Sequence, residues 1–237
     1  MKKYGLAPTV ALLAALTLNA CGGGGSSDQG GNGPDMGQPL VVDANGASGF
    51  DRVLLGSTLT ALPVEALSAA EMATLVFMRE EEKLAHDVYA QLDARWGANV
   101  RVFGNIANSE ATHTEAVRQL LVRYGLPDPA STLATGVFQN TSLQLLYTQL
   151  VASGTLSLTE ALRAGAAIEE IDMMDINTAL LAVDNQDIRL VYESLLKGSR
   201  NHLRSFVATL LNQGVTYVPQ YMNVVDYSAI VATAIER

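Results

Sequence analysis

The stretch Ile106-Ala-Asn-Ser-Glu110-Ala-Thr-His113 places an acid and a histidine three residues apart within an amphipathic segment. Three residues of a helix make nearly one turn, so both side chains lie on one face, where they can ligate one metal ion or bridge two. Glu110 and His113 interrupt the apolar stripe of a helix predicted over about residues 102–124. The other residues of that stripe are Phe103, Ile106, Val117, Leu120 and Tyr124.

Three further long amphipathic helices are predicted, over about residues 68–96, 157–183 and 187–212. Capping boxes begin two of them, and glycines follow the ends of three of the four long helices. Each of these further helices also carries an acid or a histidine on its apolar stripe or at its edge. These residues are Glu82, Glu169 with Asp172, and His202.

Successive residues of a helix are about 100° apart around its axis. This angle predicts whether an acid next to a candidate ligand faces the core or the solvent. Glu80 and Glu81 are displaced from the stripe that carries Glu82, and they are predicted to face solvent. Glu170 is displaced in the same way from Glu169 and is the second choice as a ligand there.

The links between the first and second long helices and between the third and fourth are short, which makes each pair antiparallel. The middle connection is long, at roughly 30 residues, and holds a short helix near 142–151. The sequence therefore predicts an all-α fold, a four-helix bundle with one long crossover, over residues 68–214.

Several buried carboxylates without cations would each cost several kcal/mol and would repel one another. A pair of metal ions would cancel that charge. The alternative is a structural polar network in which the acids pair with Arg79, His86 or Arg200. An inward acid or histidine on each of four helices favours the metal site.

The first residues have the features of a targeting segment. Met1-Lys2-Lys3 precedes an apolar stretch, and Leu18-Asn-Ala-Cys21 resembles the lipobox of bacterial lipoproteins. Residues 1–20 are predicted to be a signal peptide and Cys21 to be lipidated; an ordinary signal peptide with a chance cysteine is the alternative. The expected location is the bacterial cell envelope, lipid-anchored to a membrane, with the domain in the periplasm or outside the cell.

Three other segments flank the predicted bundle. Residues 21–39 are rich in glycine and serine and are predicted to be a flexible tether, and residues 40–67 show no clear period and are predicted to be an irregular lead-in. Residues 215–237 are predicted to be a tail that packs on the bundle, with a short final helix near 227–235.

The chain of 237 residues has 24 acidic and 15 basic side chains and a formal net charge of −9. Nucleic acid is therefore not expected as a partner, since its phosphates require basic patches. Cys21 is the only cysteine. No disulfide is expected, and burial of apolar side chains must stabilise the domain.

These residues resemble the ferritin-like di-iron carboxylate superfamily, and rubrerythrin-type proteins in particular, in a branch without an assigned substrate. Glu82-Lys-Leu-Ala-His-Asp-Val-Tyr89 is similar to the family's Glu-x-x-Ala-x-x-x-Tyr helix, and 106–113 is similar to its Ile-Ala-x-x-Glu-x-x-His segment. Glu169 to Asp172 is similar to the acidic pair of the third helix. The resemblance implies two iron ions, with manganese or zinc as substitutes, held by Glu82, Glu110, His113, Glu169, Asp172 and His202.

Around these ligands, Tyr89, His86 and Ser199 are expected to lie in the surrounding shell. Ser199-Arg-Asn-His202 departs from the family, which has Glu-x-x-His at this place. Glu193 cannot substitute, because it lies on the opposite side of the helix. The chain also has no Cys-x-x-Cys pair, so electrons would come from an external donor.

The resulting functional hypothesis is an oxidoreductase that reacts with O2 or hydrogen peroxide, as a ferroxidase or a peroxide scavenger. One alternative is metal binding without turnover. Another is a metal-free helical interaction module at the cell surface. A homodimer is compatible with each of the three.

Overall fold

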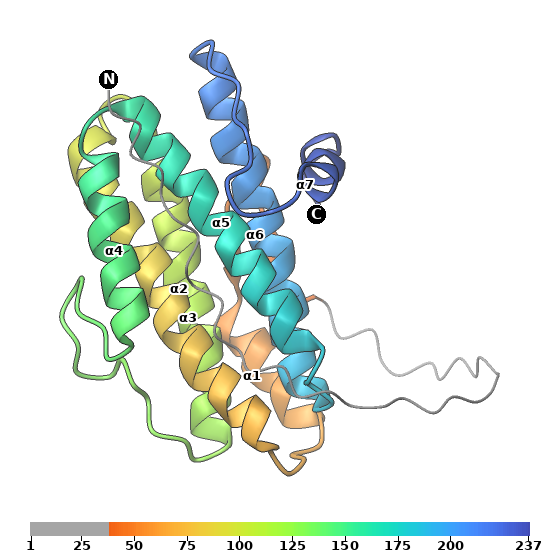
Figure 1. Ribbon diagram of the computed structural model, residues 1–237. Helices are drawn as coiled ribbons and strands as arrows, with labels where there is room; N and C mark the ends of the chain where they lie inside the picture. The colour runs from red at the N-terminus through yellow and green to blue at the C-terminus, as the bar shows by residue number, and fades with distance from the viewer. Residues whose placement is uncertain (1–37) are drawn as a thin grey trace. The chain divides into compact units, whose positions relative to one another are not determined.

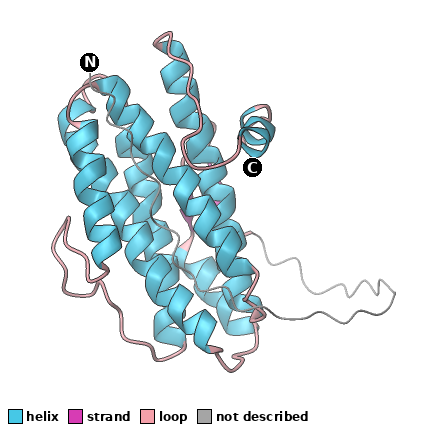
Figure 2. Ribbon diagram, viewed as in Figure 1, coloured by secondary structure: helices cyan, strands magenta, loops and turns pink. Residues whose placement is uncertain are grey.

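A computed structural model of the chain describes residues 38–237. The predicted signal peptide, Cys21 and the tether as far as Gly37 lie outside the described residues. Helices dominate the described part, so the predicted all-α class is confirmed (Figure 2). In chain order the elements are β1 (Leu40–Val42), β2 (Ser48–Phe50), α1 (Arg52–Ala61), α2 (Ala69–Trp96), α3 (Val102–Arg123), α4 (Thr141–Gly154), α5 (Leu158–Leu180), α6 (Gln186–Asn212) and α7 (Val224–Val231) (Figure 1).

The four long helices form two closely packed pairs. Helix α2 packs most extensively against α3, and α5 packs most extensively against α6. The link within each pair is only a few residues long, which makes the two helices of a pair antiparallel (Figure 1). The connection between the pairs contains α4, which is longer than the sequence predicts and packs on both α2 and α5.

Local signals account for the ends of the helices. Ser68 and Glu71 form the predicted capping box, in which Ser68 Oγ accepts a hydrogen bond from the Glu71 amide and Glu71 Oε2 accepts one from the Ser68 amide. Gly125 and Gly214 follow α3 and α6 with φ of +65° and +73°, a conformation that only glycine adopts readily.

The core consists of two apolar clusters with a layer of polar side chains between them. One cluster is built around Tyr89, Phe103 and Phe206, and the other around Leu75 and Leu120. Each long helix contributes to both clusters. On α2, α3 and α6 the inward polar residues fall between the two contributions, whereas on α5 Glu169 and Asp172 lie among the last residues of the first contribution, which ends at Met173. The polar layer is therefore closed by hydrophobic packing on two sides.

The segment predicted to be an irregular lead-in contains regular structure. Strands β1 and β2 form an antiparallel hairpin, with Leu40 opposite Phe50 and Val42 opposite Ser48, and α1 follows. Asp51 caps α1 by accepting from the amides of Val53 and Leu54. Two strands of three residues are too short to show a period in the sequence, which explains why the hairpin was not predicted. Strand β2 packs against α3 and also contacts α6.

Residues after Gly214 return to the long helices. Tyr217 and Tyr227 are buried in the apolar cluster around Phe206, and α7 packs against α6. Helix α7 covers Val224–Val231 and so begins earlier and ends earlier than the sequence predicts. Within residues 38–237, no helix combines the length and the apolar content needed to cross a bilayer.

Candidate metal centre

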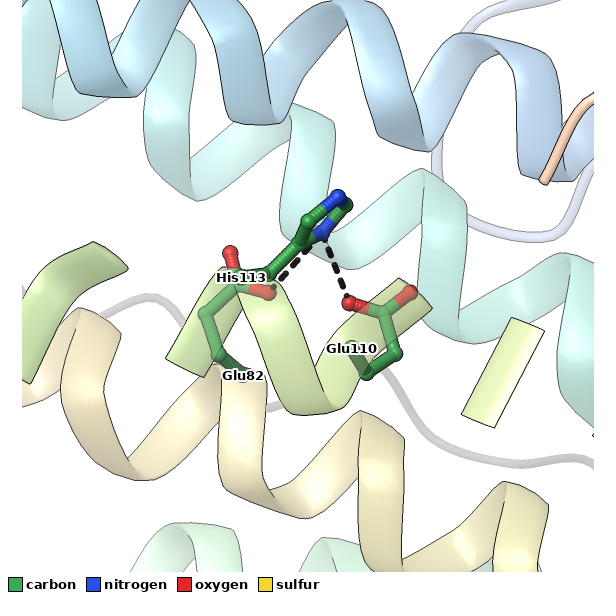
Figure 3. Close-up of side chains that lie close together, drawn as sticks. All are labelled: Glu82, Glu110 and His113. Carbon is green, nitrogen blue, oxygen red and sulfur yellow. Dashed lines mark ion pairs between the residues drawn. The ribbon is translucent and has the colours of Figure 1, made fainter. Parts of the chain in front are cut away.

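The six side chains predicted as ligands lie together in the polar layer between the two apolar clusters. Helices α2, α3, α5 and α6 each contribute at least one of them. None is more than 4 % exposed, and the six are Glu82, Glu110, His113, Glu169, Asp172 and His202. Figure 3 shows the part of this cluster in which Glu82 and Glu110 approach His113.

Glu110 lies between the two histidines. Its Oε2 is 2.9 Å from Nδ1 of His113, and its Oε1 is 2.8 Å from Nδ1 of His202. Glu82 Oε2 lies 3.5 Å from Nδ1 of His113, and Glu169 Oε2 lies 3.5 Å from Nδ1 of His202. Two half-sites result, each with two carboxylates and one imidazole, and they share Glu110. In each half-site one ligand atom per residue lies within 4.8 Å of the others.

Asp172 occupies the side of the cluster that faces Ser199. The Ser199 hydroxyl donates to Asp172 Oδ2 over 2.5 Å, while Asp172 Oδ1 has no hydrogen-bond partner. The family resemblance leads one to expect a carboxylate at position 199 of the fourth long helix. Here Ser199 offers a hydroxyl instead, and this hydroxyl binds the Asp172 carboxylate of α5.

Unsatisfied polar atoms distinguish this cluster from the other buried acids of the described residues, with Glu81 as the exception. Glu71, Glu80, Asp87, Glu170 and Asp187 are buried, and their carboxylates accept hydrogen bonds from amides, hydroxyls or cationic side chains. Both carboxylate oxygens of Glu82 and Nδ1 of both histidines have no partner in hydrogen-bond geometry. Buried polar atoms are rarely left unpaired. Carboxylate and imidazole atoms that converge without donors are a donor set that fits metal ions.

The basic side chains that a metal-free polar network would require pair with other acids, outside the cluster. Arg79 pairs with Asp128, and Arg200 pairs with Glu236. His86, predicted to lie in the shell around the ligands, is 36 % exposed in its side chain and pairs with Asp87 instead. These three residues therefore provide no counter-charge for the cluster.

Tyr89 contacts the cluster directly, as the sequence predicts for a residue of the surrounding shell. Its hydroxyl lies 2.5 Å from Glu169 Oε1 and 3.1 Å from the carbonyl oxygen of Gly165. Tyr89 is fully buried, so its hydroxyl proton can be given only to these two acceptors. This contact orients the Glu169 carboxylate toward the cluster.

The prediction of solvent-facing Glu80 and Glu81 is wrong, because both are at most 4 % exposed. Glu80 accepts hydrogen bonds from the amides of Gln139 and Asn140, just before α4. Glu81 lies beside Glu82, and neither of its carboxylate oxygens has a partner. Sequence periodicity missed Glu80 because the connection between α3 and α5 covers it, and it missed Glu81 because this side chain faces Asp172 and Asp175 of α5.

Glu170, the second choice as a ligand, has a different role. Its carboxylate accepts from the Tyr217 hydroxyl at 2.6 Å and from the amides of Gln220, Tyr221 and Met222. Glu170 therefore holds the C-terminal segment against α5. Glu169 is the acid of this pair that faces the histidines.

The carboxylates and imidazoles of the cluster titrate far from their ordinary ranges. Burial raises the pKa of Glu82 to about 8, with the charge of Glu110 adding to the effect and His113 opposing it. Burial likewise raises the pKa of Asp172 well above its usual value, and the charges of Glu82 and Glu169 increase the shift. Glu82, with a pKa of about 8, therefore holds a proton at neutral pH when no metal ion is bound.

Nearby carboxylates raise the pKa values of the two histidines and so favour their charged forms. Burial disfavours their charged forms, but Glu169 and Glu110 raise the pKa of His202 to about 9, and Glu110 raises the pKa of His113 well above its usual range. Although burial opposes ionisation of Glu110, both histidines hold the pKa of Glu110 well below its ordinary value. His202, with a pKa of about 9, is therefore protonated at neutral pH and offsets the charge of Glu110 when no metal ion is bound.

One residue that touches the cluster carries no signal in the sequence. Ser48 of β2 places its hydroxyl oxygen 2.9 Å from Nε2 of His113 and 3.0 Å from Nε2 of His202. A single serine in a segment without periodicity gives no sequence signal for such a contact.

The difference between Glu80 and Glu81 can be tested by stability. Glu81→Met is expected to raise the free energy of unfolding of the metal-free protein by about 1–3 kcal/mol, because it removes a buried carboxyl group that lies beside the charges of Asp172 and Asp175. Glu80→Met is the matched control and is expected to lower it by a similar amount, since two amides lose their acceptor. Urea unfolding of both variants measures the effects, and equal destabilisation by both would contradict this account of Glu81.

The described residues thus form an all-α protein with a buried carboxylate and histidine cluster that could bind metal ions. Residues 71–234 match the family described as "Uncharacterized protein domain (DUF2202)", and the chain belongs to this family. It is 45 % identical to "Uncharacterized protein MJ0754" of Methanocaldococcus jannaschii over 179 residues, which cover 76 % of this chain and 96 % of the relative. A crystal structure of hypothetical protein MJ0754 from Methanococcus jannaschii superposes with a TM-score of 0.71 at 45 % identity, covering 74 % of this chain and 99 % of that one.

Proposed function

We propose that the protein binds two iron ions in the shared cluster and reacts with O2 or hydrogen peroxide, as a ferroxidase or a peroxide-scavenging oxidoreductase. One observation carries the proposal: Glu110 offers one carboxylate oxygen to the Nδ1 side of each histidine. Carboxylate and imidazole ligands suit iron and manganese, and zinc is a further candidate.

A ferritin-like four-helix bundle with one long crossover is part of this proposal. Support comes from the two antiparallel pairs of long helices, α2 with α3 and α5 with α6, and from the long connection between them. In bundles of this kind, inward carboxylates and Glu-x-x-His motifs from facing helices build the metal site.

The residues divide into two half-sites and a shared ligand. His113 Nδ1 with Glu82 would hold one ion, and His202 Nδ1 with Glu169 would hold the other. Glu110 would bind both ions. Asp172, held by Ser199, provides a further carboxylate next to these ligands.

Two bound iron ions would supply the electrons and the open coordination position that reduction of O2 or hydrogen peroxide requires. The chain supplies the surroundings. The apolar clusters on both sides exclude bulk water from the polar layer. Tyr89 holds a proton on its hydroxyl group within hydrogen-bond distance of Glu169.

Metal binding is expected to release protons, and the affinity is therefore expected to rise with pH. Glu82, with a pKa of about 8, and His202, with a pKa of about 9, carry protons at neutral pH that a metal ion must displace. Below these values protons compete with the metal, and above about pH 9 the competition ends. Competition titrations with a chelator across this range measure the effect, and a pH-independent affinity would contradict it.

The reaction can be tested on protein loaded anaerobically with Fe(II). On addition of O2 or hydrogen peroxide, the loaded protein is expected to consume the oxidant faster than the same concentration of free Fe(II). His202→Ala, which removes one half-site, is expected to lose this acceleration. Consumption no faster than that of free Fe(II) would contradict the catalytic proposal.

Metal binding without turnover is the second candidate, and Ser199 is the observation that favours it. The family resemblance implies a glutamate at position 199 of α6. The serine found there leaves the cluster with one carboxylate fewer. Two tightly bound metal ions that neither consume O2 nor decompose peroxide would support this candidate. Failure to bind any metal would leave the metal-free interaction module.

The envelope location is also a proposal, and the sequence around Cys21 supports it. A lipid anchor on Cys21 would tether the domain to a membrane, an external donor would supply electrons, and a homodimer is compatible with this arrangement. Cys21→Ala is expected to move the protein from the membrane fraction to the soluble fraction. Retention of this variant in the membrane fraction would contradict the anchor.

A further inference from the structure

The hydroxyl of Ser48 lies on the outer side of both histidine rings. Ser48 is 5 % exposed, and its Oγ is 2.9 Å from Nε2 of His113 and 3.0 Å from Nε2 of His202. The Nδ1 atoms of the same rings face Glu110. The rings stack on each other with centroids 5.4 Å apart, which brings both Nε2 atoms within reach of one hydroxyl.

The Ser48 hydroxyl can form a hydrogen bond with each of the two histidine rings. A histidine that binds a metal ion through one nitrogen keeps a proton on the other and donates it to a partner in the protein, which fixes the ring orientation. A serine oxygen has two acceptor lone pairs. Ser48 can therefore accept from Nε2–H of His113 and from Nε2–H of His202 at the same time.

The surrounding residues hold the hairpin in this position. The Ser48 amide donates to Ser109 Oγ over 2.9 Å, and the Phe50 amide donates to Thr112 Oγ1 over 3.0 Å. On the other side, a Cβ at Gly198 would lie 2.9 Å from Ser48 Oγ and 2.6 Å from Cε1 of His113. Helix α6 thus leaves just enough room for the serine and the ring.

We propose that Ser48 is a positioning residue for both metal half-sites, which directs Nδ1 of each histidine toward the metal ions. This inference rests on the proposed metal binding. It also extends the site beyond the matched family region, because the hairpin precedes residue 71. The metal centre would then need a segment outside that region to reach full affinity.

Ser48→Ala tests the proposal. Both rings lose their common acceptor, and the affinity for Co(II) and Zn(II) is expected to fall by about 10- to 100-fold at both half-sites together. Ser205→Ala is the matched control, because Ser205 Oγ donates to the carbonyl of Asn45 in the hairpin loop and touches neither ring. Competition titrations of the full chain against a chromophoric chelator measure both variants.

A second readout separates positioning from general stability. In the zinc-loaded wild type, ¹⁵N-labelled histidines are expected to show two slowly exchanging Nε2–H signals, and Ser48→Ala is expected to lose both. Equal affinity of Ser48→Ala and wild type, or equal losses in Ser48→Ala and Ser205→Ala, would overturn the role of Ser48 while leaving metal binding intact. A wild type that binds neither ion would instead overturn the proposed function itself.

Discussion

Glu110→Gln is expected to remove both metal ions together, although it changes a single oxygen to an amide nitrogen. Among residues 38–237, Glu110 is the one carboxylate that approaches both histidines, with Nδ1 distances of 2.9 and 2.8 Å. Removing one partner of a buried charged set costs about 3–5 kcal/mol, which corresponds to about 100-fold or more in affinity. Elemental analysis after anaerobic Fe(II) loading and desalting measures the loss.

Glu115→Gln is the matched control for this variant. It lies on the same helix, but its carboxylate pairs with Arg118 away from the cluster. It is expected to retain the wild-type metal content. Loss of only one ion in Glu110→Gln would show that Glu110 is not shared between the half-sites.

Metal loading is expected to stabilise the protein strongly. A ligand that binds only the folded state adds about 2.7 kcal/mol when present at 100 times its dissociation constant. Two such sites would add about 5 kcal/mol, which for a domain of this size raises Tm by about 10 °C or more. Thermal unfolding with and without Fe(II), Mn(II) or Zn(II) measures the shift.

The Glu110→Gln variant provides the control for the thermal experiment. Its Tm is expected to change little on addition of the same ions, because the shared ligand is gone. If the wild type also shows no shift with any of the three metals, the cluster is not a metal site. The protein would then be the metal-free helical module considered from the sequence.

Sequence periodicity and capping predicted the long helices well, because their apolar residues repeat over many turns. Ser68 with Glu71 begins α2, and glycines follow α3 and α6, as the sequence indicates. The burial of the candidate ligands was also predictable. An acid such as Glu82 or Glu110 on an apolar stripe must be buried when that stripe forms the core.

Features that depend on weakly periodic segments were not predictable. Glu80 is covered by the connection between α3 and α5, Glu81 faces Asp172 and Asp175 of α5, and Glu170 is covered by the segment after Gly214. Ser48 reaches the histidines only because a hairpin of two short strands packs against α3. In each case the partner is far away in the sequence and leaves no local pattern.

The most direct test of the central claim is an anaerobic titration of the protein with Fe(II), followed by separation of free from bound metal. The account predicts two ions per chain in the wild type and far fewer in Glu110→Gln at the same free concentration. A wild type that binds no iron, or a Glu110→Gln variant that binds as much as the wild type, would contradict the shared two-metal site.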